Sequence, residues 1–334
     1  MHQALLEDPW RVPDPSEADL FYIRMYSVLS YKLLGTDKRC NGKTHTGRMR
    51  DSTLFLEKSS PYFKRYGGAD HVLICAWWNC RVALDPFVRM QLARVVIGIN
   101  EKVTNWARWG CNGRMVTVPY TASSEVTTAE RIGGRPPEER NIPFFFAGTS
   151  RGRPERENLV VVRDLFPDST IDIGDRGRFW SENATEYADH ITRSRYCFCP
   201  RGDSATSRRI FDAIAAGCIP VLTEVEAGVL PFIEGRGLNV SKFSIVAPKR
   251  TLKDQELLTA LVQHLAAKSD VELEPMRGAM KKVTRSLIYG VASGPDISDM
   301  HPFREVPERF LQLVGNGFIF QSGCIFHTAW HITS

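Results

Sequence analysis

The sequence predicts an α/β protein of two domains, with a parallel sheet in the second. Three observations lead to this prediction. Strand-like and helix-like segments alternate through the second half of the chain, as they do in parallel sheets covered by helices. A segment rich in glycine, proline and charge, Thr121–Asn141, interrupts the apolar patterning. The 334 residues, 43% of them hydrophobic, suffice for two cores.

The alternation in the second half is read from apolar runs bounded by turn residues. The expected strands are Phe144–Ala147, Thr170–Ile173, Tyr196–Cys199 and Ile219–Leu222, and the expected helices are Arg156–Leu165, Ala184–Arg193, Ser207–Ala216 and Gln255–Ala267. The first half gives weaker signals, with strands expected at Leu20–Ile23, His71–Trp77 and Val116–Pro119 and a helix at Ser59–Tyr66. We therefore expect a first domain at 1–132, a linker at 133–142, a second domain at 143–306 and a tail at 307–334.

The composition narrows the class of partner. The net charge is +5 and the isoelectric point is near 8.8, which favours anionic ligands such as nucleotide phosphates or an acidic glycan. This charge is too weak and too scattered to indicate a nucleic-acid partner. The eight cysteines include no C-x-x-C pair and suit either disulfides in an oxidising lumen or buried thiols. No run reaches the roughly 20 apolar residues of a membrane span, so we expect membrane attachment only through an anchor absent from this chain.

The most informative segment is Tyr196–Phe232, which contains one predicted strand–helix–strand unit with a ligand expected beyond the carboxyl ends of its strands. The helix would begin at Ser207, and its free N–H groups would face a diphosphate. Arg209 adds a bidentate donor for phosphate oxygens, and Asp212 can accept hydrogen bonds from a ribose diol. The alternative is that Arg209 and Asp212 form a surface ion pair without a ligand.

A second turn, at Gly148, follows the first strand of this half and precedes Arg151, Arg153 and Arg156. Backbone N–H groups and arginines can converge on a diphosphate at such a turn. The same arginines also suit a solvated face of the protein.

Taken together, these residues resemble the exostosin family of glycosyltransferases. The matching motifs of the second half are Phe146-Ala147-Gly148, Arg156-x-x-Leu159, Tyr187, Ser194-x-Tyr196-Cys197, Pro200-x-Gly202-Asp203, Ser207-x-Arg209, Asp212-Ala213-Ile214 and Gly217-Cys218-Ile219-Pro220-Val221. Weaker matches in the first half are Asp14-Pro15, Pro61-Tyr62, Gly67-Gly68-Ala69-Asp70-His71 and Val118-Pro119-Tyr120. The resemblance covers roughly residues 12–290, most of the chain.

The resemblance implies a GT-B architecture, in which two Rossmann-like domains with parallel sheets face a cleft. It implies an inverting glycosyltransferase that moves a hexosyl or pentosyl group from a nucleotide diphosphate-sugar, expected to be a UDP-sugar, to a polysaccharide or glycan. It also implies a type II membrane protein of the Golgi lumen. The expected donor-binding residues are Gly148, Arg156, Ser207, Arg209, Asp212, Gly217 and Glu224.

The catalytic base is expected in the first domain, at Asp70 and His71, which follow a Gly-Gly turn. The alternative is a structural histidine hydrogen-bonded in the core. Because no Asp-x-Asp triplet occurs, we expect arginines and helix dipoles to neutralise the leaving diphosphate, with no cofactor and no required divalent metal.

Two rival functions remain open from the sequence. The first is a catalytically inactive glycan-binding or scaffold protein of the same fold, in which Arg209 and Asp212 have no ligand. The second is a nucleotide-sugar epimerase or dehydrogenase, which is disfavoured because no G-x-G-x-x-G follows an early strand.

Overall fold

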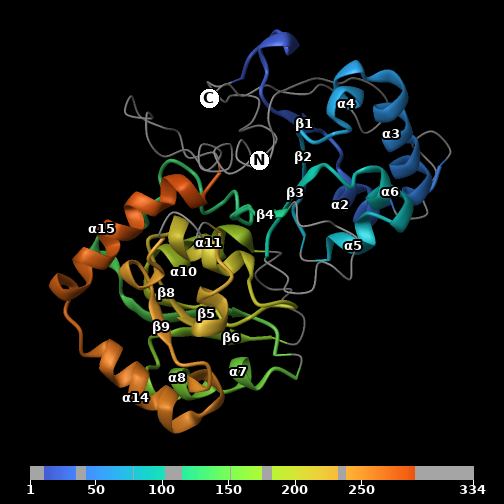
Figure 1. Cartoon of the computed structure of the whole chain (residues 1–334). Coiled ribbons are helices and arrows are strands. Elements are labelled where there is room, and N and C mark those ends of the chain that lie inside the picture. Colours follow the sequence, from blue (N-terminus) through green and yellow to red (C-terminus); the bar gives the residue numbers. More distant parts are fainter. Residues whose placement is uncertain are drawn as a thin grey trace. The chain divides into compact units, whose positions relative to one another are not determined.

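The computed structural model describes residues 11–34, 43–77, 79–101, 115–150, 152–174, 183–231 and 238–289. These residues form two compact units that meet in the chain between Val118 and Pro119 (Figure 1). None of the helices in this described part is both long and apolar enough to cross a membrane. The predicted tail at 307–334 and the arginine at 151 lie outside the described residues.

The first unit is built on a four-stranded parallel sheet in the order β1-β2-β3-β4. Its strands are β1 (Phe21–Ile23), β2 (His71–Cys75), β3 (Val96–Ile99) and β4 (Met115–Thr117). Its helical segments are η1 (Pro15–Glu17), α2 (Ser27–Leu29), η2 (Ser30–Leu34), α3 (His45–Ser59), α4 (Pro61–Tyr66), α5 (Cys80–Ala83) and α6 (Pro86–Gln91). The motifs that resemble the family were weaker in this half of the chain than in the second half. The parallel strands of this sheet confirm the predicted α/β fold for the first unit.

Local capping explains where the helices of the first unit begin and end. Ser60 accepts hydrogen bonds from the first-turn N–H groups of α4, and Pro61 starts that helix. Gly67 then ends it in a left-handed conformation with φ +57°. Asp85 caps α6 in the same way as Ser60 caps α4.

The second unit is built on a five-stranded parallel sheet in the order β6-β5-β7-β8-β9. Its strands are β5 (Ile142–Gly148), β6 (Thr170–Ile173), β7 (Ser194–Phe198), β8 (Ile219–Thr223) and β9 (Ile245–Ala247). Its helical segments are η4 (Pro137–Glu139), α7 (Pro154–Glu157), α8 (Val160–Leu165), α10 (Ala184–Thr192), α11 (Arg208–Ala215), α12 (Glu224–Ala227), η5 (Val240–Lys242), η6 (Thr251–Lys253), α14 (Gln255–Ala266) and α15 (Asp270–Leu287). The four strands predicted for this half are all present, so the α/β prediction is confirmed.

Helices cover both faces of this second sheet (Figure 1). Helices α10, α11 and α15 lie on one side, and α7, α8 and α14 lie on the other. Strand β5, an inner strand of the sheet, is buried between them, and the ring of Phe144 stacks on Tyr196 of the neighbouring strand with 5.5 Å between ring centroids. Such burial on both faces explains why β5 is a continuous apolar run rather than an alternating one.

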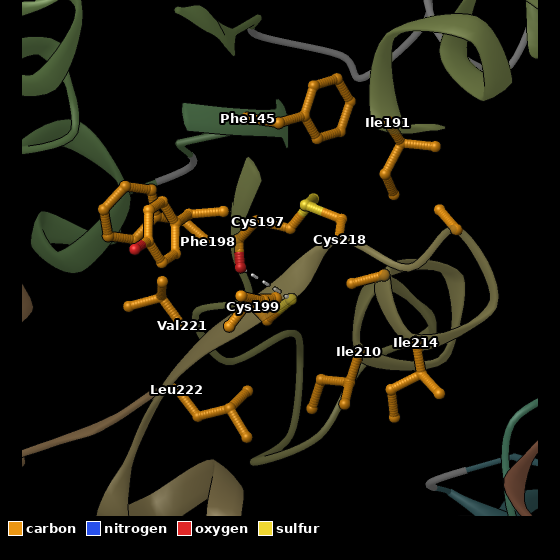
Figure 2. Packing of buried hydrophobic residues seen from close by; sticks show 14 of the residues in the cluster. Phe145, Ile191, Cys197, Phe198, Cys199, Ile210, Ile214, Cys218, Val221 and Leu222 are labelled. Atoms are coloured by element: carbon orange, nitrogen blue, oxygen red, sulfur yellow. Dashed lines mark hydrogen bonds between the residues drawn. A yellow bond between two sulfur atoms is a disulfide. The ribbon is translucent and has the colours of Figure 1, made fainter. Parts of the chain in front are cut away.

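A disulfide between Cys197 and Cys218 links the strands on either side of α11. Figure 2 shows it among buried side chains of the second core, with the Cys199 thiol donating a hydrogen bond to the Cys197 carbonyl at 3.4 Å. A second disulfide, in the first unit, joins Cys75 to Cys80.

The boundary between the units differs from the predicted linker at 133–142. The chain from Pro119 onward belongs to the second unit, and Val126 is buried in its core. Arg140, only 5% exposed, donates hydrogen bonds to the carbonyls of Ser194 and Ala216. Glycine and proline mark this segment because it makes close turns over the second unit, not because it spans between units.

Candidate functional site

The strand order of the second unit places its functional edge. Strands β6 and β8 lie on opposite sides of the β5–β7 pair, so the chain leaves β5 in one direction and β7 in the other. In open parallel sheets ligands bind outside the carboxyl ends of the strands at this point of reversal. We call the carboxyl ends of β5 and β7 the switch point. Gly148 ends β5 there, and the Pro200–Gly202 turn follows β7.

The Arg209 guanidinium lies at the switch point and bridges its two sides. Its Nε donates to the Ala147 carbonyl at 2.9 Å, and its Nη1 donates to the Pro200 carbonyl at 3.5 Å and the Ser207 hydroxyl at 3.2 Å. The Nη2 group lies against Gly148, where an added Cβ would be only 2.8 Å from it. Nη2 makes no hydrogen bond to any described residue, so two N–H groups remain for a ligand.

Arg156 forms a second bridge across the switch point. Its Nη1 donates to the Thr149 carbonyl and its Nη2 to the Arg201 carbonyl, both at 2.6 Å. The side chain is buried, at 5% exposure, and comes from α7, directly after β5. The structure therefore brings together four of the predicted donor-binding residues: Gly148, Arg156, Ser207 and Arg209. Both arginines already donate several of their N–H groups to backbone carbonyls.

The switch point carries an excess of positive charge. Burial, the charge of Arg209 and the charge of Arg153 lower the pKa of Arg156 to about 10. Burial is also the main cause that lowers the pKa of Arg209. A nearby carboxylate, that of Asp203, lies 3.6 Å from Arg153 but is largely exposed to solvent. Crowded, partly desolvated arginines of this kind favour an anionic ligand.

Glu226 is a member of this region whose role the sequence analysis did not identify. It is 3% exposed, and its carboxylate accepts hydrogen bonds from the Thr223 N–H at 2.8 Å, from the Thr223 hydroxyl and from the Arg201 N–H at 3.0 Å. The spacing Thr223-x-x-Glu226 is that of a capping box, so the contact to Thr223 was readable from the sequence. The contact to Arg201 was not, because it depends on β7 and β8 being neighbours.

Asp212 does not have the role predicted for it. Its carboxylate is fully buried and accepts hydrogen bonds from the Ser123 N–H at 2.7 Å, the Tyr187 hydroxyl at 2.9 Å and the Arg208 Nε at 3.2 Å. Burial raises the pKa of Asp212 despite these donors. The carboxylate thus joins α11, α10 and the segment after Pro119, and a ribose diol cannot reach it in this structure.

Gly217 also has a structural position rather than a donor-binding one. Its φ is +63°, and a Cβ there would lie 2.1 Å from the Gly133 carbonyl oxygen. The Gly133 N–H donates to the Ala215 carbonyl at 2.7 Å, which satisfies the carboxyl end of α11. Only glycine allows this close approach of two backbones.

The predicted base, Asp70 with His71, is buried in the first unit. Both side chains have 0% exposure, and His71 Nδ1 lies 2.7 Å from Asp70 Oδ1. The imidazole stacks on Phe21 and meets Phe63 edge-on. Burial lowers the pKa of His71, against the opposing effect of its hydrogen bond to Asp70. This geometry matches the alternative of a structural histidine, because neither side chain exposes an atom to an acceptor substrate.

Glu224 begins α12 at the carboxyl end of β8, one strand beyond the switch point. It is exposed, and its Oε2 accepts a hydrogen bond from the Lys249 N–H at 3.3 Å. Its contact with a donor sugar stays a prediction.

Plant proteins are among the relatives of the chain. The protein named "Probable arabinosyltransferase ARAD1" from Arabidopsis thaliana is 26% identical over 292 residues, which cover 85% of this chain and 61% of the relative. The protein named "Probable glucuronosyltransferase Os01g0926400" from Oryza sativa subsp. japonica is 27% identical over 249 residues, covering 70% of this chain and 56% of the relative. The chain thus spans little more than half the length of the curated relatives it matches.

Among solved structures, WaaG, a glycosyltransferase involved in lipopolysaccharide biosynthesis, is 11% identical, with 82% of this chain and 84% of that chain covered at a TM-score of 0.41. The family model described as the exostosin GT47 domain matches residues 1–265, well over half of the chain. The chain therefore belongs to the exostosin GT47 family.

Proposed function

We propose that this protein is a glycosyltransferase that moves a sugar from a nucleotide diphosphate-sugar to a glycan acceptor. One observation carries the proposal: the positively charged switch point, where Arg156, Arg209 and the amino end of α11 converge on the carboxyl ends of two parallel strands. Family membership and the printed names of the relatives support the same activity.

The proposed reaction inverts the anomeric centre. The acceptor oxygen forms a bond to the anomeric carbon, and the acceptor proton passes to a base. The bond from that carbon to the diphosphate oxygen breaks, with the electron pair staying on the diphosphate. Arg209 Nη2, the Arg156 charge and the first-turn N–H groups of α11 stabilise the developing charge, so the reaction as proposed requires no divalent metal.

The test uses purified protein and a panel of nucleotide sugars. The relatives carry names of arabinosyl-, glucuronosyl- and galactosyltransferases, so the panel includes the UDP forms of these sugars and of xylose, and the GDP-sugars. We expect release of nucleotide diphosphate with one donor, and a rise in melting temperature with UDP or GDP that Arg209→Ala abolishes. The control Arg163→Ala changes an exposed arginine of α8 and should keep the shift. No release and no shift with any nucleotide would favour the inactive scaffold.

We also propose that the protein works in the Golgi lumen, as a type II membrane protein at full length. Two disulfides in the described part of the chain support an oxidising compartment. Asn183 and Asn239, each the first residue of a glycosylation sequon, are exposed. Digestion of protein from its native cells with an N-glycosidase should lower its mass, and a protein without glycans that fractionates with the cytosol would contradict this location.

A further inference from the structure

The main chain of Arg201 is held on both sides of its Cα by buried charged groups. Its N–H donates to Glu226 Oε1 at 3.0 Å, and its carbonyl accepts from Arg156 Nη2 at 2.6 Å. Glu226 is 3% exposed and Arg156 is 5% exposed. Hydrogen bonds to ionised groups are about twice as strong as neutral ones, so this turn is fixed more firmly than an ordinary loop.

The groups that hold Arg201 are themselves attached to the neighbouring strands. The other oxygen of Glu226 accepts the Thr223 N–H at the end of β8, and Arg156 Nη1 donates to the Thr149 carbonyl after β5. Since Arg201 itself follows β7, its main chain is tied to the ends of three adjacent strands, β5, β7 and β8. This precision at one residue is unexpected for a turn whose side chain makes no structural contact.

The Arg201 side chain, unlike those of the neighbouring arginines, is not used to hold other parts of the protein. It is exposed, and within the described part of the chain its guanidinium forms no hydrogen bond or ion pair. Arg156 and Arg209 direct N–H groups at backbone carbonyls, and Arg208 is paired with Asp212. Among the described arginines of the switch point, Arg201 is thus the one whose whole donor fork is available to solvent and ligand.

We propose that Arg201 contacts the diphosphate of the sugar donor directly, and that Glu226 and Arg156 are positioning residues that aim it. This inference rests on the proposed function and names the group that recognises the leaving diphosphate. A guanidinium presents parallel N–H donors to two phosphate oxygens. The strength of this contact depends on how firmly the main chain of the arginine is held in position.

Calorimetric titration with inorganic pyrophosphate and with UDP tests the proposal without knowledge of the sugar. Arg201→Gln should lower the affinity for both ligands about tenfold or more, since a hydrogen bond to a charged group is lost. Arg201→Lys, which keeps the charge but not the fork, should fall between Arg201→Gln and the wild type. Arg163→Gln is the matched control and should bind as the wild type does. Because Arg201 is exposed, none of these variants should lower the melting temperature.

A double-variant cycle separates positioning from general stability. Glu226→Gln should weaken pyrophosphate binding in the wild-type background and have little further effect in the Arg201→Gln background, while it lowers the melting temperature equally in both. Equal weakening in both backgrounds would mean that Glu226 is only structural. If the wild type binds UDP and Arg201→Gln binds it as tightly, Arg201 has no such role. If the wild type binds neither pyrophosphate nor any nucleotide diphosphate, the proposed function itself fails.

Discussion

The absence of a side chain at Gly148 sets the position of the Arg209 guanidinium. The backbone there is ordinary strand, so its glycine is not explained by a left-handed conformation. A Cβ would instead come within 2.8 Å of Arg209 Nη2 and 3.0 Å of the Phe146 ring. The guanidinium also lies over that ring, 5.3 Å from its centroid. Gly148 therefore makes room for a cation at the end of β5.

Gly148→Ala should displace Arg209 and weaken binding of UDP by about tenfold, because Arg209 contributes charge-assisted hydrogen bonds that depend on its position. The fold should survive, since alanine is acceptable in a strand and the flexible end of Arg209 can move. Calorimetric titration gives the affinity, and circular dichroism with thermal melting monitors the fold.

Gly278→Ala is the matched glycine control. It lies within α15 with nothing within 4 Å of the added Cβ, so the free energy of unfolding should rise by about 1 kcal/mol while UDP affinity stays the same. Unchanged UDP affinity in Gly148→Ala would contradict the role assigned to this space.

At the scale of elements, the β7–α11–β8 unit carries most of the candidate site. The Cys197–Cys218 disulfide closes a chain segment of 21 residues that includes the switch-point turn and the whole of α11 (Figure 2). The disulfide of the first unit spans only 5 residues. Closing a longer loop removes more entropy from the unfolded chain, so the two bonds should differ in what they contribute.

Replacing Cys197 and Cys218 by serine should lower the free energy of unfolding of the second unit by about 3 kcal/mol. The matching double replacement of Cys75 and Cys80 should cost the first unit about 2 kcal/mol. Urea denaturation followed by circular dichroism measures both, with a separate transition expected for each unit. We expect UDP affinity to fall only in the first variant, because only its loop contains Arg201 and Arg209. A loss of affinity in both variants would contradict the placement of the donor site.

At the scale of the whole molecule, acid should act unequally on the two units. The first unit contains two buried histidines, and burial lowers the pKa of both His45 and His71 below the ordinary 6.5. Below pH 6.5 the unfolded chain takes up protons that the folded unit does not, so stability falls as the pH falls. Above pH 6.5 the two states bind the same number of protons at these sites.

The first unit should therefore lose up to about 1.4 kcal/mol per pH unit for each histidine below pH 6.5. Urea unfolding at pH 7.5 and pH 5.5 measures this loss. The double variant with glutamine at positions 45 and 71 should show a flatter pH dependence, whatever its absolute stability. If the variant keeps the pH dependence of the wild type, other groups are responsible.

Much of this molecule was predictable from local sequence. Strands β5, β6, β7 and β8 of the second unit, and β1, β2 and β4 of the first, follow from apolar runs with turn residues at their ends, and both are local properties. Strands β3 and β9 were not predicted. The closeness of Gly148 and Arg209 was also predictable, because both were expected at the carboxyl ends of neighbouring parallel strands. Their binding of a diphosphate stays a prediction. The motif order across Phe146–Val221 gave the family, which the match over residues 1–265 confirms.

Helix periodicity could not tell which polar residues are buried. Asp212 was expected to accept hydrogen bonds from a ribose diol, but the Ser123 N–H and the Tyr187 hydroxyl donate to its carboxylate instead. The glycines after Thr121 indicated a linker, whereas they pack on the carboxyl end of α11. In each instance the covering segment is distant in sequence, so no local window contains the information.

The sequence by itself determined the α/β class, the family and the strand ends from which the candidate site is built. Only the tertiary structure decided which charged residues hold the backbone and which one stays exposed. Arg156, Arg201 and Arg209 all follow strands or open helices in the same basic region, yet two of them are used on carbonyls and one remains exposed. Strand order and burial make that distinction, because a guanidinium's partners depend on which strand ends lie side by side.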